Sequence, residues 1–346
     1  MTVLSGTLNA IARSRDKMIQ KTSLDLKEIY QPIEAWLPKV EERIYDILST
    51  PNELSAEVIE HFFRAKGKFL RPALTLFGVS FSSERMEAAV VTAAALEIFH
   101  SATLIHDDIV DSACLRRSLP TINVKWDPQV AVLVGDYLHD RAISAIFSTR
   151  NDRVIAAFLE TAGIVCDGEI LELKEKNNFS LTEETYFTII ERKTAALLGT
   201  CIESGAILGH LSSEEVIALR RYGLYFGMAF QIVDDCLDFM GKENEFGKTL
   251  GADLKAGVLT LPLIRLIALL DEPQKAEIFS QVKNGLGHSQ LSDLLRLLEE
   301  YDALSYAYDR AREYADRAQL ELTIFPDSPS RVSLEMLLHY VIERHR

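Results

Sequence analysis

The chain has 346 residues, of which 48% are hydrophobic and 25% charged, a balance that excludes disordered and fibrous proteins. Only 17 glycines and 10 prolines interrupt it, which favours a mostly helical fold. The formal charge of −14 disfavours a nucleic-acid partner, because an acidic surface repels phosphate backbones. An anionic substrate would therefore need a local group of Lys and Arg residues or a divalent metal.

The compartment is read from cysteines and from apolar runs. The four cysteines are scattered, form no C-x-x-C pair and suggest no disulfide framework, which fits a reducing compartment. No apolar run reaches the ~20 residues of a membrane span, and the longest candidate, residues 260–270, contains Arg265. The N-terminus lacks the basic and apolar regions of a signal peptide. We expect a cytoplasmic protein without a membrane span.

Helical patterns follow one another along the chain with short breaks. Turns between helices are predicted at residues 50–52 and 325–327, and a helix start at Asp127-Pro128. Two capping boxes, Ser180-x-x-Glu183 and Ser212-x-x-Glu215, predict two more helix starts. Signals for two-residue β-hairpins are nearly absent.

Two predicted helices are long and apolar around most of their circumference, residues 86–110 and 214–240, so we expect both to be buried. No linker or low-complexity stretch divides the chain. We predict an all-α bundle of about ten or more helices. It would form one domain over residues 1–346, with little signature in residues 1–65.

Each long helix carries an acidic motif of the form D-D-x-x-D. The first motif consists of Asp107, Asp108 and Asp111, and the second of Asp234, Asp235 and Asp238. The first and last carboxylates of each motif share one helix face, because residues four apart lie one turn apart. Buried carboxylates are costly unless a cation neutralises them, and oxygen ligands favour magnesium over zinc. We expect the two motifs to face each other across a cavity and to clamp one diphosphate through several metal ions.

Basic residues accompany the two motifs. They are Lys68, Arg71, Arg116, Arg117, Lys193 and Lys248. Each one taken alone fits a solvated side chain as well as a ligand. The adjacent pair Arg116-Arg117 is the better candidate, because paired guanidinium groups suit bidentate phosphate binding.

The ordered set of motifs resembles the trans-polyprenyl diphosphate synthase family, the E-type isoprenyl diphosphate synthases, and its long-chain members most. The matching segments are Gly67-Lys68-x-x-Arg71-Pro72, residues 100–111, Leu115-Arg116-Arg117-x-x-Pro120-Thr121, Gly135-Asp136-Tyr137-Leu138, Lys193-Thr194, Phe230-Gln231-x-x-Asp234-Asp235-x-x-Asp238, Gly247-Lys248 and residues 253–262. So many matches in one order make the resemblance specific.

The resemblance implies a fold, a partner and a reaction. The fold is the isoprenoid-synthase helical bundle around a central active-site cavity, usually in a homodimer. The reaction is head-to-tail condensation of isopentenyl diphosphate with an allylic prenyl diphosphate. The cofactor is magnesium, about three ions in each active site, which manganese can replace. Transient contact with a membrane would serve product release.

The resemblance also assigns roles by position. Asp107, Asp111 and Asp234 would be the principal metal ligands, supported by Asp108, Asp235 and Asp238. Arg116, Lys193 and Lys248 would hold the allylic diphosphate, whereas Lys68, Arg71, His100 and Arg117 would hold isopentenyl diphosphate. Thr194 and Gln231 would lie beside the developing carbocation, and the released diphosphate would accept the final proton.

Four positions depart from the family pattern. Ser118 stands where the family usually has Gly, and Val258 where many members have Lys. Glu169 and Glu172 stand where Gln and Asp are frequent. One diphosphate contact is therefore in doubt at Val258, whereas Lys193 and Lys248 are present.

Residues one or two turns before the first motif are expected to limit product length. Ala102 and Thr103 occupy the zone where short-chain members carry a bulky aromatic floor, so the tunnel is open at that level. Phe99, about one turn deeper, is the next candidate floor. We expect a product well beyond fifteen carbons, with a geranylgeranyl-type synthase stopped at Phe99 as the alternative. A non-catalytic partner subunit and a terpene cyclase are the remaining alternatives.

Overall fold

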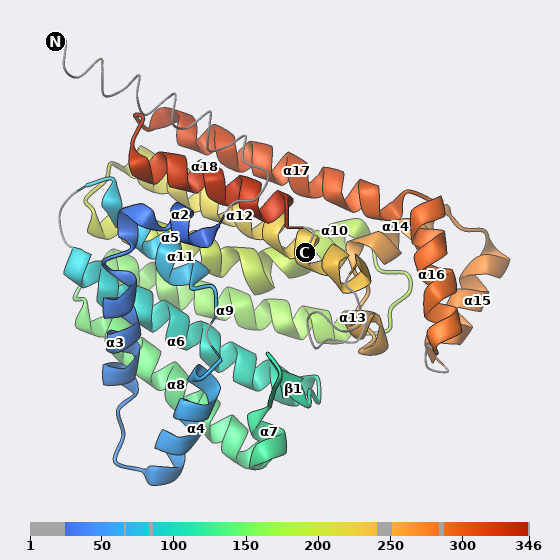
Figure 1. Cartoon of the computed structure of the whole chain (residues 1–346), viewed down its shortest axis with the longest axis horizontal. Coiled ribbons are helices and arrows are strands. Elements are labelled where there is room, and N and C mark those ends of the chain that lie inside the picture. The colour runs from blue at the N-terminus through green and yellow to red at the C-terminus, as the bar shows by residue number, and fades with distance from the viewer. Residues whose placement is uncertain (1–24, 66, 83–85, 241–250, 284–286, 345–346) are drawn as a thin grey trace. The chain divides into compact units, whose positions relative to one another are not determined.

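The structure is a computed structural model that describes residues 25–65, 67–82, 86–240, 251–283 and 287–344 (Figure 1). Helices dominate this part of the chain, which confirms the predicted all-α class. One antiparallel pair of short strands, β1 (Leu115–Arg116) and β2 (Leu119–Pro120), was not predicted. Its turn, Arg117-Ser118, contains no glycine, so the sequence carried no hairpin signal there.

The described residues fall into two compact units made of non-consecutive segments. The first takes in residues up to 160, 200–220 and 322–337, and the second residues 161–199, 221–321 and from 338 onward. Four helices contribute residues to both units: α9 (Asp152–Glu175), α11 (Ala196–Leu208), α12 (Ser213–Met240) and α18 (Pro329–Ile342).

The first unit is built around α6 (Met86–Val110), which packs against α3, α5 and α8. Its other elements are α2 (Leu26–Ile29), η1 (Gln31–Ile33), α3 (Leu37–Leu48), α4 (Glu53–Phe63), α5 (Leu70–Ser80), α7 (Ile122–Lys125), α8 (Pro128–Ser148) and η3 (Leu322–Ile324). The apolar residues of α5 and most of those of α6, many of them small alanines on α6, are buried here.

In the second unit α14 packs against α10, α16 and α17. Its elements are α10 (Glu183–Ile190), the π-helical turn η2 (Glu191–Ala195), α13 (Ala252–Lys255), α14 (Leu261–Leu269), α15 (Glu272–Lys283), α16 (His288–Glu300) and α17 (Ala303–Glu321).

The predicted helix starts are confirmed at two of three positions. Asp127 caps α8 by accepting from the Val130 N–H, with Pro128 in the first turn. Ser212 and Glu215 form the predicted reciprocal capping box before α12. The box at Ser180 is wrong: α10 starts at Glu183, and Thr182 caps it by accepting from the Thr185 N–H. A hydroxyl directly before the first helical residue can reach that N–H, and one two residues earlier cannot.

Helix α6 is long and apolar enough to cross a membrane by length and composition alone, which the search for apolar runs in the sequence did not recognise. Its most apolar window has a mean hydropathy of 1.6 and is 67% buried inside the protein. A core helix of a globular protein has these same properties.

Candidate active site

The first acidic motif lies where α6 ends. The Asp111 N–H donates to the Asp107 carbonyl over 2.8 Å, so the helical spacing continues through Asp111. Asp107 is half-buried and Asp111 is exposed. The two carboxylates therefore lie one turn apart at the solvent-facing end of an otherwise buried helix, as the spacing predicts.

The middle residue of this motif has a protein partner. Asp108 is 4% exposed, and its carboxylate accepts two 2.9 Å hydrogen bonds from the Arg116 Nε and a 2.8 Å contact from Nη2. Burial raises the pKa of Asp108, and Arg116 acts against that rise. Asp108 and Arg116, expected to contact metal and diphosphate, are thus bound to each other. The pair fixes the β1–β2 hairpin on α6.

The hairpin turn is strained. Arg117 and Ser118 have φ values of 49° and 65°, the left-handed region that favours glycine. The departure noted at Ser118 therefore falls where a glycine would relieve backbone strain.

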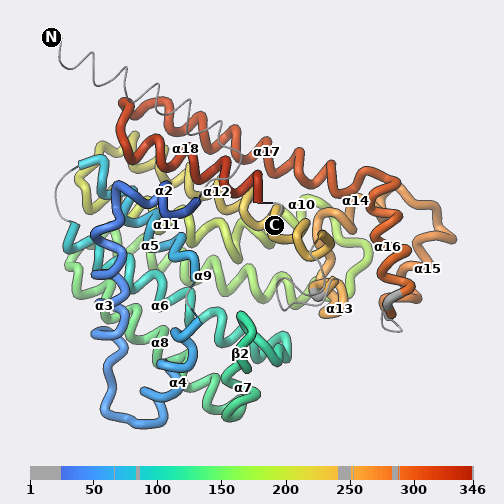
Figure 2. Tube along the Cα trace, viewed as in Figure 1, coloured from blue at the N-terminus to red at the C-terminus, as the bar shows by residue number. Residues whose placement is uncertain are grey.

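Helix α4 holds the hairpin and α7 in place. The buried His61 ring donates from Nε2 to the Pro120 carbonyl over 2.8 Å, so Nδ1 is the acceptor for the Lys125 ammonium at 3.2 Å. The Trp126 ring lies edge-on to His61 at 5.2 Å. Figure 2 shows α4, β2 and α7 close to one another, although α4 is distant from the other two in sequence. His61 was not singled out from the sequence.

His106 explains part of the Gly135-Asp136 motif. Its Nε2 lies 3.5 Å from an Asp136 carboxylate oxygen and 3.4 Å from the Val132 carbonyl. The ring lies directly against Gly135, where a Cβ atom would overlap it. Glycine is therefore required at this position of α8 for His106 to keep its place beside the first motif.

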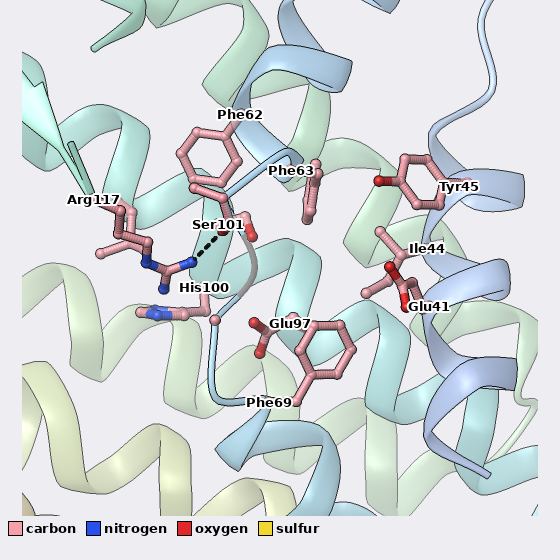
Figure 3. Close-up of a pocket in the computed structure, with 13 residues that line it drawn as sticks. Glu41, Ile44, Tyr45, Phe62, Phe63, Phe69, Glu97, His100, Ser101 and Arg117 are labelled. Carbon is pink, nitrogen blue, oxygen red and sulfur yellow. Dashed lines mark hydrogen bonds between the residues drawn. The ribbon is translucent and has the colours of Figure 1, made fainter. Parts of the chain in front are cut away.

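A pocket partly open to solvent lies between α3, α4 and α6 (Figure 3). Its polar lining includes Glu97 and His100 from α6 and Arg117 from the hairpin, and the Arg117 Nη1 donates to the Ala65 carbonyl over 2.8 Å. The rings of Phe62, Phe63 and Phe69 and the side chain of Leu104 line it as well. A charged end and an apolar end suit a small amphiphilic anion.

Three arginines act on His100 in this pocket. Burial and then the charges of Arg71, Arg116 and Arg117 hold the pKa of His100 well below its usual value, so the ring is neutral near pH 7. Burial lowers the pKa of Arg71, and the charge of Glu97 opposes this. The buried Nε of Arg71 has no hydrogen-bond partner among the described residues. The structure thus brings together three of the four residues assigned to isopentenyl diphosphate.

Gly67 and Phe69, on either side of Lys68 in the sequence, line this pocket, and so does Glu97. Lys68 is exposed, and its carbonyl accepts from the Tyr30 hydroxyl over 2.9 Å. Glu97 was missed, although a glutamate one turn before His100 on an apolar helix is an available signal. Burial raises the pKa of Glu97, and the attraction of Arg71 and Arg117 opposes the rise.

The second motif lies within α12, in the second unit. Asp234 is half-exposed and accepts from the Arg344 Nη2 over 2.8 Å. Asp238 accepts from the Asp253 N–H over 3.3 Å. Both outer carboxylates of this motif therefore have a donor from another segment of the chain.

The middle residue, Asp235, is 4% exposed, and its donors among the described residues are uncharged. Its two oxygens accept from the Tyr186 hydroxyl over 2.6 Å and from the Gln231 amide over 2.7 Å. Burial holds the pKa of Asp235 well above its usual value, and Asp253 adds to the rise. The Gln231 carbonyl oxygen in turn accepts from the Thr194 hydroxyl over 2.8 Å. Thr194, Gln231, Asp235 and Tyr186 form one continuous hydrogen-bonded chain.

Lys193 and Thr194 lie on the π-helical turn η2, a kind of turn often found at functional sites. The Lys193 ammonium lies 2.8 Å from Glu169 and 2.6 Å from Glu172. A Cβ on Gly227 of α12 would lie 2.5 Å from the Ala195 Cα, so glycine allows the close approach of α12 to this turn. Lys248 lies outside the described residues.

The three residues expected to limit product length lie on α6. Ala102 is 1% exposed, and the Thr103 hydroxyl donates to the His100 carbonyl over 2.9 Å. Phe99 is buried, with its ring 5.3 Å from Phe158 and 5.6 Å from His139. The sequence could not identify Phe158 and His139, because they come from α9 and α8.

The donor set suits a divalent ion that shares its ligands with a substrate. Within the described part of the chain, no group of three His, Cys, Asp or Glu side chains could hold a metal. Magnesium does not need such a group, since it usually binds one or two carboxylates, water and phosphate oxygens. The carboxylates of Asp107 and Asp111, one turn apart at a solvent-facing helix end, fit this mode.

Comparison with known proteins gives the family. Octaprenyl diphosphate synthase of Escherichia coli is 31% identical over 323 residues, which cover 93% of this chain and 100% of that protein. Geranylgeranyl diphosphate synthase of Saccharolobus solfataricus is 33% identical over 315 residues, 88% of this chain and 94% of that protein. The solved structure of a polyprenyl synthase from Caulobacter crescentus CB15, complexed with calcium and isoprenyl diphosphate, has a TM-score of 0.89 at 31% identity. It covers 94% of this chain and 100% of that one.

A family model described as polyprenyl synthetase matches residues 52–298, well over half of the chain. The match includes Arg71, His100 and Arg117 and both acidic motifs. With these relatives covered over nearly their whole length, the chain belongs to the polyprenyl synthetase family, whose members are prenyltransferases.

Proposed function

We propose that this prenyltransferase condenses isopentenyl diphosphate with an allylic prenyl diphosphate to a longer all-trans polyprenyl diphosphate. One observation carries the proposal: His100 and Asp107, each of which we assign to a diphosphate, lie on the same helix, α6. His100 lies beside Arg71 and Arg117. Seven residues of helix separate His100 from Asp107 by about 10 Å, a separation suited to two substrates that must react with each other.

Members of the family use a divalent metal to ionise the allylic diphosphate. We assign magnesium, about three ions, with manganese as a substitute. Asp107, Asp111 and Asp234 would hold it, which requires both acidic motifs to act on one diphosphate. When bound, magnesium supplies positive charge to the leaving diphosphate.

The remaining roles belong to the chain's own side chains. Arg116 and Lys193, each directed by the carboxylates that already hold it, neutralise the leaving diphosphate together with Lys248. Arg71, His100, Arg117 and Lys68 orient isopentenyl diphosphate. Thr194 and Gln231 present oxygen atoms toward the carbocation, and the chain of hydrogen bonds through Asp235 keeps them oriented. The released diphosphate takes the proton that the new chain loses.

Incubation of the purified protein with magnesium, labelled isopentenyl diphosphate and allylic primers of ten to twenty carbons tests this function. Incorporation of label only when a primer is present supports it. No incorporation by the protein alone would favour the partner-subunit alternative. A cyclic hydrocarbon released from the allylic diphosphate alone would favour a terpene cyclase.

We propose a product well beyond fifteen carbons, because the side chain of Ala102 is small and Phe99, packed on Phe158 and His139, is the next bulky group. Chromatography of the dephosphorylated product measures its length. Ala102→Phe is expected to shorten the product. A mainly twenty-carbon alcohol from the wild-type protein would select the geranylgeranyl alternative.

We propose a homodimer that pairs through α9. Leu159, Ile170 and Leu173 are 45%, 59% and 45% exposed, and with exposed Gly163 and Cys166 they lie at alternating spacings of four and three residues. This is the spacing of a helix–helix seam. Sedimentation should give a dimer that Ile170→Asp dissociates, and oxidation should link Cys166 to its equivalent in a Cys114→Ser background. A wild-type monomer would contradict the proposal.

We further propose that the protein acts in the cytoplasm as one domain over residues 1–346, without a nucleic-acid partner. The match over residues 52–298 supports a single domain, because it runs through residues of both units. A membrane would be contacted only to release a long product. Recovery of the protein in the membrane fraction after high-salt washing would contradict this placement.

A further inference from the structure

One carboxylate of the second motif has a basic partner that comes from the end of the chain. The Arg344 Nη2 donates to Oδ1 of Asp234 over 2.8 Å, and 110 residues separate the two in sequence. The Arg344 side chain is 7% exposed, whereas that of Asp234 is 46% exposed. A nearly buried guanidinium thus holds a carboxylate that still reaches solvent.

Arg344 is itself held from a second side. Its guanidinium lies 4.6 Å from the centroid of the Phe230 ring, one turn before Asp234 on α12. Cation–π contact and burial together restrict the guanidinium to one place. The contact with Asp234 is therefore a built feature of α12 and not the chance pairing of two flexible surface side chains.

The hydrogen bond engages one oxygen only. By comparison, Asp108 of the first motif has both oxygens bound by Arg116. Within the described residues, no hydrogen bond is formed to Oδ2 of Asp234. The Asp234 carboxylate is thus oriented through Oδ1, and Oδ2 is left for another ligand.

We propose that Arg344 is a positioning residue that orients Asp234 to bind the divalent cation through Oδ2. The inference rests on the proposed function, which makes Asp234 a metal ligand. A carboxylate fixed in advance loses less rotamer entropy when it binds a metal, and partners that orient ligands raise metal affinity. The positive charge of Arg344 repels a metal cation bound to Asp234. The Asp234 carboxylate balances the guanidinium charge, and because this carboxylate is half-exposed, water screens the repulsion. The proposal requires orientation to outweigh this repulsion.

The experiment titrates Mn²⁺ into the full-length protein with inorganic pyrophosphate present and measures free Mn²⁺ by electron paramagnetic resonance. Arg344→Met is expected to weaken Mn²⁺ binding by about 10- to 100-fold. Arg344→Gln keeps one donor and is expected to lose less. The matched control is Arg317→Met, since Arg317 lies 4.1 Å from the Tyr225 ring of the same helix, with no contact to the motif. That variant should bind Mn²⁺ like the wild-type protein.

Unchanged or tighter Mn²⁺ binding by the Arg344 variants would overturn the proposal, since tighter binding would make Arg344 a competing cation. Circular dichroism establishes that each variant is folded, and Arg344→Gln decides the question if Arg344→Met does not fold. If the wild-type enzyme is active but the Arg344 variants bind Mn²⁺ as tightly as it does, this inference alone is refuted. A wild-type protein that incorporates no isopentenyl diphosphate would refute the proposed function instead.

Discussion

The two acidic motifs have the same D-D-x-x-D pattern, yet their middle carboxylates have different partners. Asp108, at the end of α6, is bound by the guanidinium of Arg116. Asp235, within α12, is bound by the uncharged Tyr186 and Gln231. Both residues are 4% exposed to solvent.

Burial and the neighbouring charges act together on the pKa of each middle residue. Burial raises both pKa values, but a guanidinium opposes the rise at Asp108, whereas Asp253 and Asp234 increase it at Asp235. Asp108 therefore belongs to an ion pair that fixes the hairpin. Asp235 favours its neutral form and orients Gln231. The same D-D-x-x-D pattern thus places its middle carboxylate in an ion pair in the first motif and beside uncharged donors in the second.

The largest expected effect comes from the outer carboxylates, where the two motifs should behave alike. Asp107→Ala or Asp234→Ala is expected to lower turnover about a thousandfold or more. Each variant removes a proposed ligand of the metal ions whose positive charge stabilises the leaving diphosphate. Initial rates with labelled isopentenyl diphosphate measure this. Asp316→Ala, an exposed carboxylate of α17, is the control. Near-normal turnover in either variant, with the fold intact, would refute the metal assignment.

The middle carboxylates should separate the motifs. Asp108→Asn leaves Arg116 without a charged partner and lets the hairpin shift, so kcat/KM should fall about 100-fold. Asp235→Asn replaces a neutral acid with a neutral amide of the same shape and should change kcat/KM less than about threefold. Both variants are measured with the same primer at saturating magnesium. Equal losses of kcat/KM in the two variants would mean that Asp108 and Asp235 do not differ in charge.

A pH series tests the neutral form of Asp235 by a different route. The folded protein holds this proton at a raised pKa, whereas the unfolded chain releases it near pH 4. Stability is therefore lost as pH rises above that value, and Asp235→Asn lacks this loss. The urea midpoint of the variant should exceed that of the wild-type protein by more at pH 7 than at pH 4. Asp316→Asn should give a constant difference, and a constant difference for Asp235→Asn would contradict the raised pKa.

The smallest expected effect concerns the β1–β2 hairpin, which is bound to the first motif through Arg116. Ser118 has a φ of 65°, so Ser118→Gly removes strain from the turn and should stabilise the protein by about 0.5 kcal/mol after the larger backbone entropy of glycine is counted. Thermal unfolding measures this. Ser112→Gly provides a comparison, because Ser112 has a φ of 52° outside the hairpin turn. Destabilisation by Ser118→Gly would mean that the serine side chain contributes to the turn.

Local signals in the sequence were enough for the helices. The predicted limits of α6 coincide with residues 86–110, and the capping box at Ser212 starts α12, because periodicity and capping act over a few residues. The box at Ser180 failed because Thr182 competes for the same role two residues later. The hairpin was missed because its turn lacks glycine.

The sequence by itself determined the helical class, the two acidic motifs and the spacing that puts Asp107 and Asp111 on one face. The tertiary structure alone decided which charge each buried carboxylate meets. The partners of Asp235 and Asp234 include Tyr186, 49 residues away, and Arg344, 110 residues away. No periodicity extends over such distances, because partners from separate helices are chosen by packing and by the cost of burying an unpaired charge. The identity of that partner determines whether a carboxylate forms an ion pair, stays neutral or remains available to a metal.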